Sequence, residues 1–187
     1  MDYRVILSSR RRSPYRSAGA GGAPPAHLAG AWLAAALIVC LAACGAVPDP
    51  VALFEQGDYD EAFALFSARA ADGDIVAINY IGMHYYLGAG VERNFPEAFK
   101  WFERAALAEH PGAQRNLGVM YLRGLGVTAD NHQAYGWLYH ARERGNEGAN
   151  DYLRMISDNV TPNAAGIARK RVRQRIVAAR AGQASVP

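Results

Sequence analysis

AINYIGMHYYLGAGV at residues 77–91 returns in a related form as AQRNLGVMYLRGLGV at residues 113–127. Six residues are identical at a spacing of 36 positions: Ala77, Gly82, Tyr85, Gly88, Gly90 and Val91 match Ala113, Gly118, Tyr121, Gly124, Gly126 and Val127. The following residues keep this spacing, with Asn94, Ala98 and Trp101 matched by Asp130, Ala134 and Trp137. Matches at one fixed offset of about 20 to 50 residues indicate stacked supersecondary units. The sequence therefore predicts a repeat protein.

Each copy has the pattern of two helices joined by a glycine-rich loop. Apolar residues three and four positions apart predict the first helix, and Gly88 is placed to end it as a left-handed cap. An internal glycine costs a helix about 1 kcal/mol relative to alanine, so Gly82 suggests that a neighbouring backbone approaches closely there. Asn94 precedes Glu97 by three residues, the capping-box pattern that starts a helix. The expected buried stripe of the second helix is Ala98, Trp101, Phe102 and Ala105, repeated as Ala134, Trp137, Leu138 and Ala141.

These motifs resemble the Sel1-like repeat, a relative of the tetratricopeptide repeat. The Leu-Gly-x-x-Tyr, Gly-x-Gly-Val and Ala-x-x-Trp pattern is the one that family shows, although Ile81 stands where the first copy would usually have leucine. The resemblance implies an all-α solenoid, a right-handed stack of antiparallel helix pairs whose concave surface binds other proteins. Fold alone does not settle function.

The repeat phase extends to both sides of the two full copies. Residues 50–71 keep the phase of the second helix but join their helices through a tight Gly-Asp turn, and residues 149–158 form a partial unit. Thr161 and Pro162 supply an N-cap and a first-turn proline for a last helix with a basic surface, expected to cap the stack. The expected helices are 50–56, 59–71, 77–87, 95–108, 113–123, 131–144, 149–158 and 162–180. The solenoid is thus assigned to 50–158, and the capping helix and tail to 159–187.

Residues 1–43 have the features of a secretory signal segment. Five arginines precede an apolar run from Leu28 to Ala43, which is short for a membrane-spanning helix. Leu41-Ala42-Ala43-Cys44-Gly45 resembles the lipobox of bacterial lipoproteins, which implies that Cys44 is the lipidated first residue of the mature chain. Residues 44–49 would then be a tether. The alternative is an uncleaved membrane anchor with an incidental cysteine.

Cysteine and charge restrict the chemistry of the mature part. Its only cysteine is Cys44, so the mature domain has no disulfide and no free thiol for catalysis or zinc binding. From Cys44 to Asp158 there are 9 basic and 16 acidic residues, whereas from Asn159 onward there are 6 basic residues and no acidic ones. Anionic lipid head groups or an acidic partner are more plausible targets for the basic helix than nucleic acid.

The histidines give no sign of a catalytic or metal site. No two of them have the spacing of a zinc motif, and we expect no cofactor. His84 shares the phase of Met120, which predicts a packing residue, whereas His132 and His140 are expected to be exposed. The sequence contains no Gly-x-Ser-x-Gly and no phosphate-binding glycine loop. We therefore do not expect an enzyme.

Two classes of function remain open. The first is a protein–protein interaction scaffold held on the envelope membrane through Cys44 and facing the periplasm; the absence of Asp at position 45 resembles outer-membrane sorting. The second is a peptidoglycan enzyme or its accessory, which a carboxylate pair in a cleft would favour. By resemblance, the partner would contact first-helix residues that point away from the second helix. These candidates are Asn79, Met83, Tyr86, Arg115, Asn116 and Val119.

Overall fold

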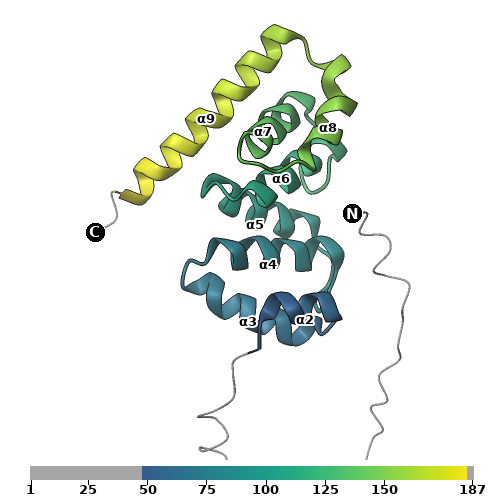
Figure 1. Ribbon diagram of the computed structural model, residues 1–187, viewed down its shortest axis with the longest axis vertical. Helices are drawn as coiled ribbons and strands as arrows, with labels where there is room; N and C mark the ends of the chain where they lie inside the picture. Colours follow the sequence, from purple (N-terminus) through teal and green to yellow (C-terminus); the bar gives the residue numbers. More distant parts are fainter. Residues whose placement is uncertain (1–47, 185–187) are drawn as a thin grey trace, which may run out of the picture. The chain divides into compact units, whose positions relative to one another are not determined.

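The computed structural model describes residues 48–184, which belong to one compact unit, and these residues form eight α-helices and no strand. The expectation of an all-α fold is confirmed (Figure 1). The helices are α2 (Pro50–Gln56), α3 (Tyr59–Ala71), α4 (Ile75–Leu87), α5 (Phe95–Leu107), α6 (Pro111–Arg123), α7 (Asn131–Glu143), α8 (Ala149–Ile156) and α9 (Pro162–Ala184), with a 3-10 turn at Ser157–Asn159 between α8 and α9. None of these helices is long and apolar enough to span a membrane. The predicted signal segment and Cys44 lie outside the described residues.

Helices pair in sequence order and stack on one another. α2 packs on α3, α4 on α5 and α6 on α7, while α3 also contacts α4 and α5 contacts α6. The bounds of α2 and α3 are those expected. α4 and α6 each begin two residues before the predicted start because residues 74 and 110 cap them. The Asp74 carboxylate accepts from the backbone N–H of Val76 at 2.8 Å, and the His110 ring accepts from that of Ala113 at 3.1 Å.

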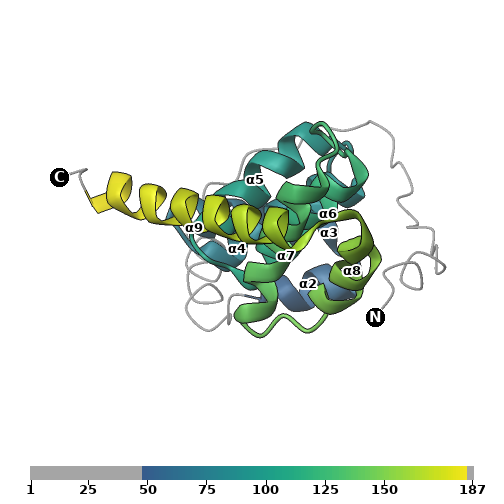
Figure 2. The ribbon, with the colours of Figure 1, turned by 90° about the horizontal axis from the view of Figure 1, so that it is seen from above.

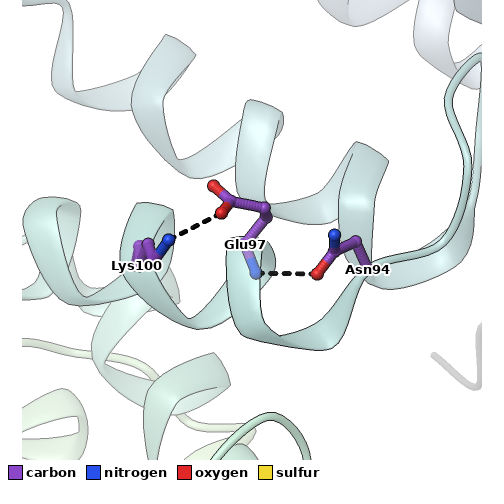
Figure 3. A network of polar contacts seen from close by, with 3 residues as sticks. All are labelled: Asn94, Glu97 and Lys100. Carbon is purple, nitrogen blue, oxygen red and sulfur yellow. Dashed lines mark hydrogen bonds and ion pairs between the residues drawn. The ribbon is translucent and has the colours of Figure 1, made fainter.

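The second helix of each full copy begins with the expected side-chain cap. Asn94 Oδ1 accepts the backbone N–H of Glu97 at 3.1 Å, and Asp130 does the same for Gln133 at 3.0 Å. The reciprocal half of the capping box is not formed, and that part of the prediction is wrong. The Glu97 carboxylate pairs with Lys100 (Figure 3), while the Asn94 N–H donates to the carbonyl of Tyr85 on the preceding helix. The N–H that a capping box would pair with the Glu97 carboxylate is thus already bonded to the preceding helix.

Glycines inside the first helices make room for a large side chain of the second helix. A Cβ on Gly82 would lie 2.7 Å from the Phe102 ring, and one on Gly118 would lie 2.7 Å from Leu138 Cγ. Phe102 and Leu138 are themselves 36 positions apart. The expectation of a close backbone approach at this phase is therefore wrong in the main, although the Ala134 carbonyl lies 3.2 Å from the same Cβ on Gly118.

The close backbone approach occurs instead at the second glycine of each loop. Gly90 and Gly126 both have φ of 69°. A Cβ on Gly90 would lie 2.9 Å from the backbone carbonyl of Tyr59, and one on Gly126 would meet that of Phe95. Tyr59 and Phe95 begin the second helix of the preceding pair. The Gly-x-Gly-Val loop therefore stacks each helix pair on the one before it, and only glycine fits there.

α9 packs mainly on α7 and also contacts α5 (Figure 2). Its Ala165, Ala168, Val172 and Ile176 are buried. This contact explains why Trp137 is fully buried whereas Trp101, predicted to be equivalent, is only half-buried. In both views the last turns of α9 extend past the neighbouring helices (Figures 1 and 2).

Candidate protein-interaction surface

A chain of side-chain hydrogen bonds joins α4 to α6 through four of the six predicted site residues. Asn79 Nδ2 donates to Met83 Sδ at 3.8 Å, and Asn116 Nδ2 donates to Asn79 Oδ1 at 3.4 Å. Arg115 Nη2 donates to Asn116 Oδ1 at 3.0 Å. We call this row, Met83–Asn79–Asn116–Arg115, the polar ladder. It links the first helices of two successive units with side chains alone.

Solvent reaches three of the four members of the polar ladder. Asn79 is 6% exposed, whereas Met83, Arg115 and Asn116 are half-buried. Val119 is also buried, at 7% exposed. Two of the six predicted contact residues therefore offer little surface, and Asn79 would act by orienting Asn116.

Tyr86 differs in orientation from the other candidates. Its ring lies 5.5 Å from that of Phe95 and 6.3 Å from that of Phe102, centroid to centroid, and both neighbours belong to α5. The expectation that Tyr86 points away from the second helix of its own unit therefore fails. Tyr86 remains half-buried, so part of its ring still meets solvent.

Arg115 extends the polar ladder toward the third unit. A Cβ on Gly148, the residue before α8, would lie 3.3 Å from Arg115 Nη1. The guanidinium therefore spans from Asn116 on α6 to the start of α8. Its planar donor fork suits carboxylate or carbonyl groups, and only part of that fork is used by Asn116.

The family model for the Sel1 repeat matches residues 75–110 and 111–146. The chain contains two Sel1 repeats. The first repeat covers α4 and α5, and the second covers α6 and α7. Sel1 repeat proteins generally mediate protein–protein interactions, and their scaffold is typically non-catalytic.

Two solved structures have a similar fold. A Sel1 repeat protein from Oxalobacter formigenes is 32% identical, with a TM-score of 0.55, over 70% of this chain and 55% of that one. A protective antigen present in uropathogenic Escherichia coli strains, with an SLR fold, is 24% identical with a TM-score of 0.59. That similarity covers 76% of this chain and 29% of the antigen, and it shows the fold alone. No curated protein matches. The chain thus spans about half of the Oxalobacter formigenes protein and under a third of the antigen.

His84 packs inside an aromatic cage at the start of the first Sel1 repeat, as its phase predicts. It is fully buried, and its ring lies 4.9 Å from that of Phe54 and 5.2 Å from that of Phe63. Nδ1 donates to the carbonyl of Ala89 at 2.6 Å, and Nε2 has no hydrogen-bond partner among the described residues. Burial lowers the pKa of His84, and the Ala89 carbonyl opposes this only in part. The imidazole is therefore a neutral core group.

His110 joins the two Sel1 repeats, a role that the sequence did not reveal. Its Nδ1 caps α6, as the carboxylate of Asp74 caps α4 36 positions earlier. Burial lowers the pKa of His110, while the charge of Asp74 acts in the opposite direction. The cap needs an unprotonated Nδ1, so protonation would remove it. The sequence did contain one indication of this capping role: His110 stands 36 positions after Asp74, at the same place in the repeat.

His140 is half-buried, and the expectation that it is exposed is wrong. Its Nε2 lies 3.2 Å from the carbonyl of Arg169 on α9. His132 is exposed, as expected. The two histidines of the second Sel1 repeat thus differ in exposure: His140 contacts the backbone of α9, whereas His132 borders a pocket beside α9 and stays exposed.

Glu109 binds α9 and the end of α7 to the junction between the repeats. Its side chain is 7% exposed and pairs with Arg144 and Arg180. The backbone of Glu109 is left-handed, at φ 68°, and the same phase holds Gly73 and Gly145 in the other units. A non-glycine residue pays a conformational cost there. The two ion pairs give a reason for a carboxylate at a glycine position.

A groove between α7 and α8 is the second surface feature beside the Sel1 repeats. Its volume is about 620 Å³, and it is lined by Tyr135, Arg142, Glu147, Asn150, Asp151, Leu153, Arg154 and Ser157. Asp151 pairs with Arg154. Glu147 and Asp151 are thus the two carboxylates of this groove, and the ion pair of Asp151 is solvent-exposed. Among residues 48–184, no cluster of three or more metal-ligating side chains is found.

Proposed function

We propose that the chain is a protein–protein interaction adaptor whose partner binds across α4 and α6 at the polar ladder. The observation that carries this proposal is the ladder itself. It places amide and guanidinium donors of two Sel1 repeats in one row, beside the half-exposed side chains of Met83 and Tyr86. Such a row can hydrogen-bond an extended peptide, while methionine and tyrosine give adaptable apolar contact.

We further propose that the adaptor is attached to the cell envelope by lipid on Cys44 and faces the periplasm, at the outer membrane. The support is the sequence around Cys44 and the apolar run before it. Two acyl chains suffice for stable anchoring, since each buried CH₂ contributes about 0.8 kcal/mol.

The polar ladder is tested by site-specific photo-crosslinking in membranes. A photoreactive residue at Met83 or Arg115 should crosslink one partner band. The same residue at Arg123, exposed at the end of α6, should not. The variant Arg115→Ala should reduce the Met83 crosslink several-fold with a nearly unchanged melting temperature, because Arg115 is half-buried and its hydrogen bonds go only to the neighbouring Asn116. Equal crosslinking at Met83 and Arg123, or an unchanged Met83 crosslink in Arg115→Ala, would place the binding site elsewhere.

The double variant Asn79→Ala/Arg115→Ala asks whether the ladder is a binding surface or a structural link. Asn79 is buried, and its loss leaves Asn116 without an acceptor, which costs about 1–3 kcal/mol if water cannot replace it. Loss of folding in this variant, with normal crosslinking in Arg115→Ala, would make the ladder structural. The groove between α7 and α8 is lined by two carboxylates, Glu147 and Asp151, and is the place where the second candidate, a cell-wall enzyme, would have its acid–base groups.

A further inference from the structure

α9 has a solvent-facing side that is both basic and apolar. Its buried residues, Ala165, Ala168, Val172 and Ile176, lie on one side of the helix. Ile167, Lys170, Gln174 and Val177 are spaced along the opposite side. Ile167 is 45% exposed and Val177 is 57% exposed, which is high for aliphatic residues only ten positions apart on one helix face.

Four cations of α9 form no ion pair within the part of the chain that the structure describes, and three of these also lie over no aromatic ring. Arg175 pairs with Glu103, Arg180 pairs with Glu109, and Arg169 lies 4.6 Å from the ring centroid of Tyr139. Lys170, Arg171 and Arg173 are exposed and form no such contact. We call Ile167, Lys170, Arg171, Arg173 and Val177 the basic face.

The opposite charge is concentrated in the first helix pair. Residues 49–74 contain seven carboxylates and one arginine. Glu55, Asp58, Asp60 and Glu61 are exposed around the turn between α2 and α3. No ion pair involves these four residues within 48–184. We call them the acidic turn.

The two charged surfaces cannot meet within one copy of the stack. The acidic turn belongs to the first helix pair, whereas the centre of α9 packs against Gly136 in the second Sel1 repeat, with α4, α5 and α6 between them (Figure 1). Each copy therefore presents an unneutralised basic surface at one end and an unneutralised acidic surface at the other.

We infer that the basic face of one copy binds the acidic turn of a second copy. A second copy is a partner of matching charge whose complementary surface the structure itself shows. A pocket of about 200 Å³ beside the basic face, lined by His132, Gln133, Ala164, Ile167, Ala168 and Arg171, offers a place for an inserted side chain. The contact is heterologous, so each bound copy leaves one end free, and longer chains form as concentration rises.

Salt should control this association. Exposed ion pairs contribute about 0.2–1 kcal/mol each, and the Debye length falls from about 30 Å at 0.01 M salt to about 3 Å at 1 M. The contact is therefore weak and is lost at high ionic strength. Association through the apolar run of residues 28–43 would instead persist at high salt, because salt does not screen apolar contacts.

The test uses the full chain in a neutral detergent, measured by sedimentation velocity. The wild type should form dimers and larger species at low salt and should dissociate at high salt. The variants Lys170→Glu/Arg171→Glu/Arg173→Glu and Glu55→Lys/Glu61→Lys should each raise the dissociation constant at least about tenfold. Mixed in equal amounts at low salt, the two variants should bind each other, because each keeps the native surface that the other lacks, whereas within either variant alone the reversed surface repels its native counterpart.

The matched control is Arg123→Glu, which reverses a cation exposed on α6 and should associate like the wild type. Circular dichroism and thermal melts establish that each variant is folded. The inference is overturned if the wild type shows no salt-dependent association, if Arg123→Glu disrupts it equally, or if the two variants fail to bind each other. Monomeric wild type whose basic face binds vesicles of anionic phospholipid would likewise overturn it and assign this face to a lipid surface.

Discussion

Gly82 and Gly118 leave room for a side chain, whereas Gly90 and Gly126 leave room for backbone. Phe102 fills the space beside Gly82, and the carbonyl of Tyr59 lies against Gly90. The sequence predicted that both phases matter, because each glycine recurs after 36 positions. It could not predict which atoms approach, because the partners lie on other helices at no fixed distance along the chain.

The two glycine roles predict different costs of substitution. Gly118→Ala gains up to about 1 kcal/mol of helix propensity but forces the Leu138 side chain to move, at about 1–3 kcal/mol, so modest destabilisation is expected. Gly126→Ala should cost more, because its φ is 69° and the neighbouring backbone cannot move independently. Urea midpoints measure both, and Gly166→Ala on α9, whose Cβ would meet only Arg169 Nη2 at 4.0 Å, should be neutral or stabilising. Equal midpoints for Gly118→Ala and Gly126→Ala would contradict this assignment.

His84 and His110 predict that stability falls in mild acid. Burial lowers the pKa of both histidines in the folded state. Below a pH of about 6.5, the pKa of an unfolded-state histidine, the unfolded chain therefore binds more protons than the folded chain. The free energy of unfolding should therefore decrease as pH falls from about 6.5 toward the folded-state values. The variant His84→Met/His110→Asn removes both groups with residues that other units already use. Met120 stands 36 positions after His84, and Asn94 is the N-cap of α5. Urea melts of this variant should show a flatter pH dependence; a slope equal to that of the wild type would disprove the assignment.

Among the helices, the repeated units were predictable and α9 was only partly so. Caps, glycines and apolar spacing fixed α2 to α7 to within two residues, since these signals are local. The packing of α9 across α7 and α5 depends on contacts distant in sequence, and the repeat phase is lost after α8. One signal was present: Gly136 stands at the phase of Lys100, whose side chain is 69% exposed. A glycine there leaves space for α9, where Val172 and the Ala168 carbonyl approach.

Gly136 therefore predicts how α9 can be released. A Cβ at this position would lie 2.8 Å from Val172 Cγ2 and 2.9 Å from the Ala168 carbonyl oxygen. Gly136→Lys should displace α9, expose Trp137 and speed tryptic cleavage at Lys170, Arg171 and Arg173 by about tenfold or more. Limited proteolysis with mass spectrometry measures the rate. Glu143→Lys, exposed on the same helix, is the control, and an unchanged cleavage rate in Gly136→Lys would show that α9 is held by other contacts.

At the scale of the whole molecule, the surfaces proposed for binding lie on different units of the stack. The two Sel1 repeats account for residues 75–146, and the units on either side of them supply the acidic turn and the basic face. The solenoid and its repeat boundaries could be predicted from the sequence because the fold is built from local, recurring contacts. For the binding surface, the sequence could predict only which positions of each repeat lie on it. It could not predict which of these side chains are exposed, since burial of Asn79 and Val119 depends on how neighbouring units approach.

The lipid on Cys44 is the last prediction. Cys44 is the only cysteine after the apolar run, and it follows Leu41-Ala42-Ala43. The wild type should incorporate a palmitate analogue and fractionate with membranes, because two acyl chains bind a bilayer stably where one binds only marginally. Cys44→Ala should remain an unprocessed precursor without label, whereas Cys40→Ala, which changes a cysteine inside the apolar run, should be processed and labelled normally. Label retained in Cys44→Ala would exclude this cysteine as the lipid site. Label lost in both variants would show that the apolar run, and not the thiol, decides processing.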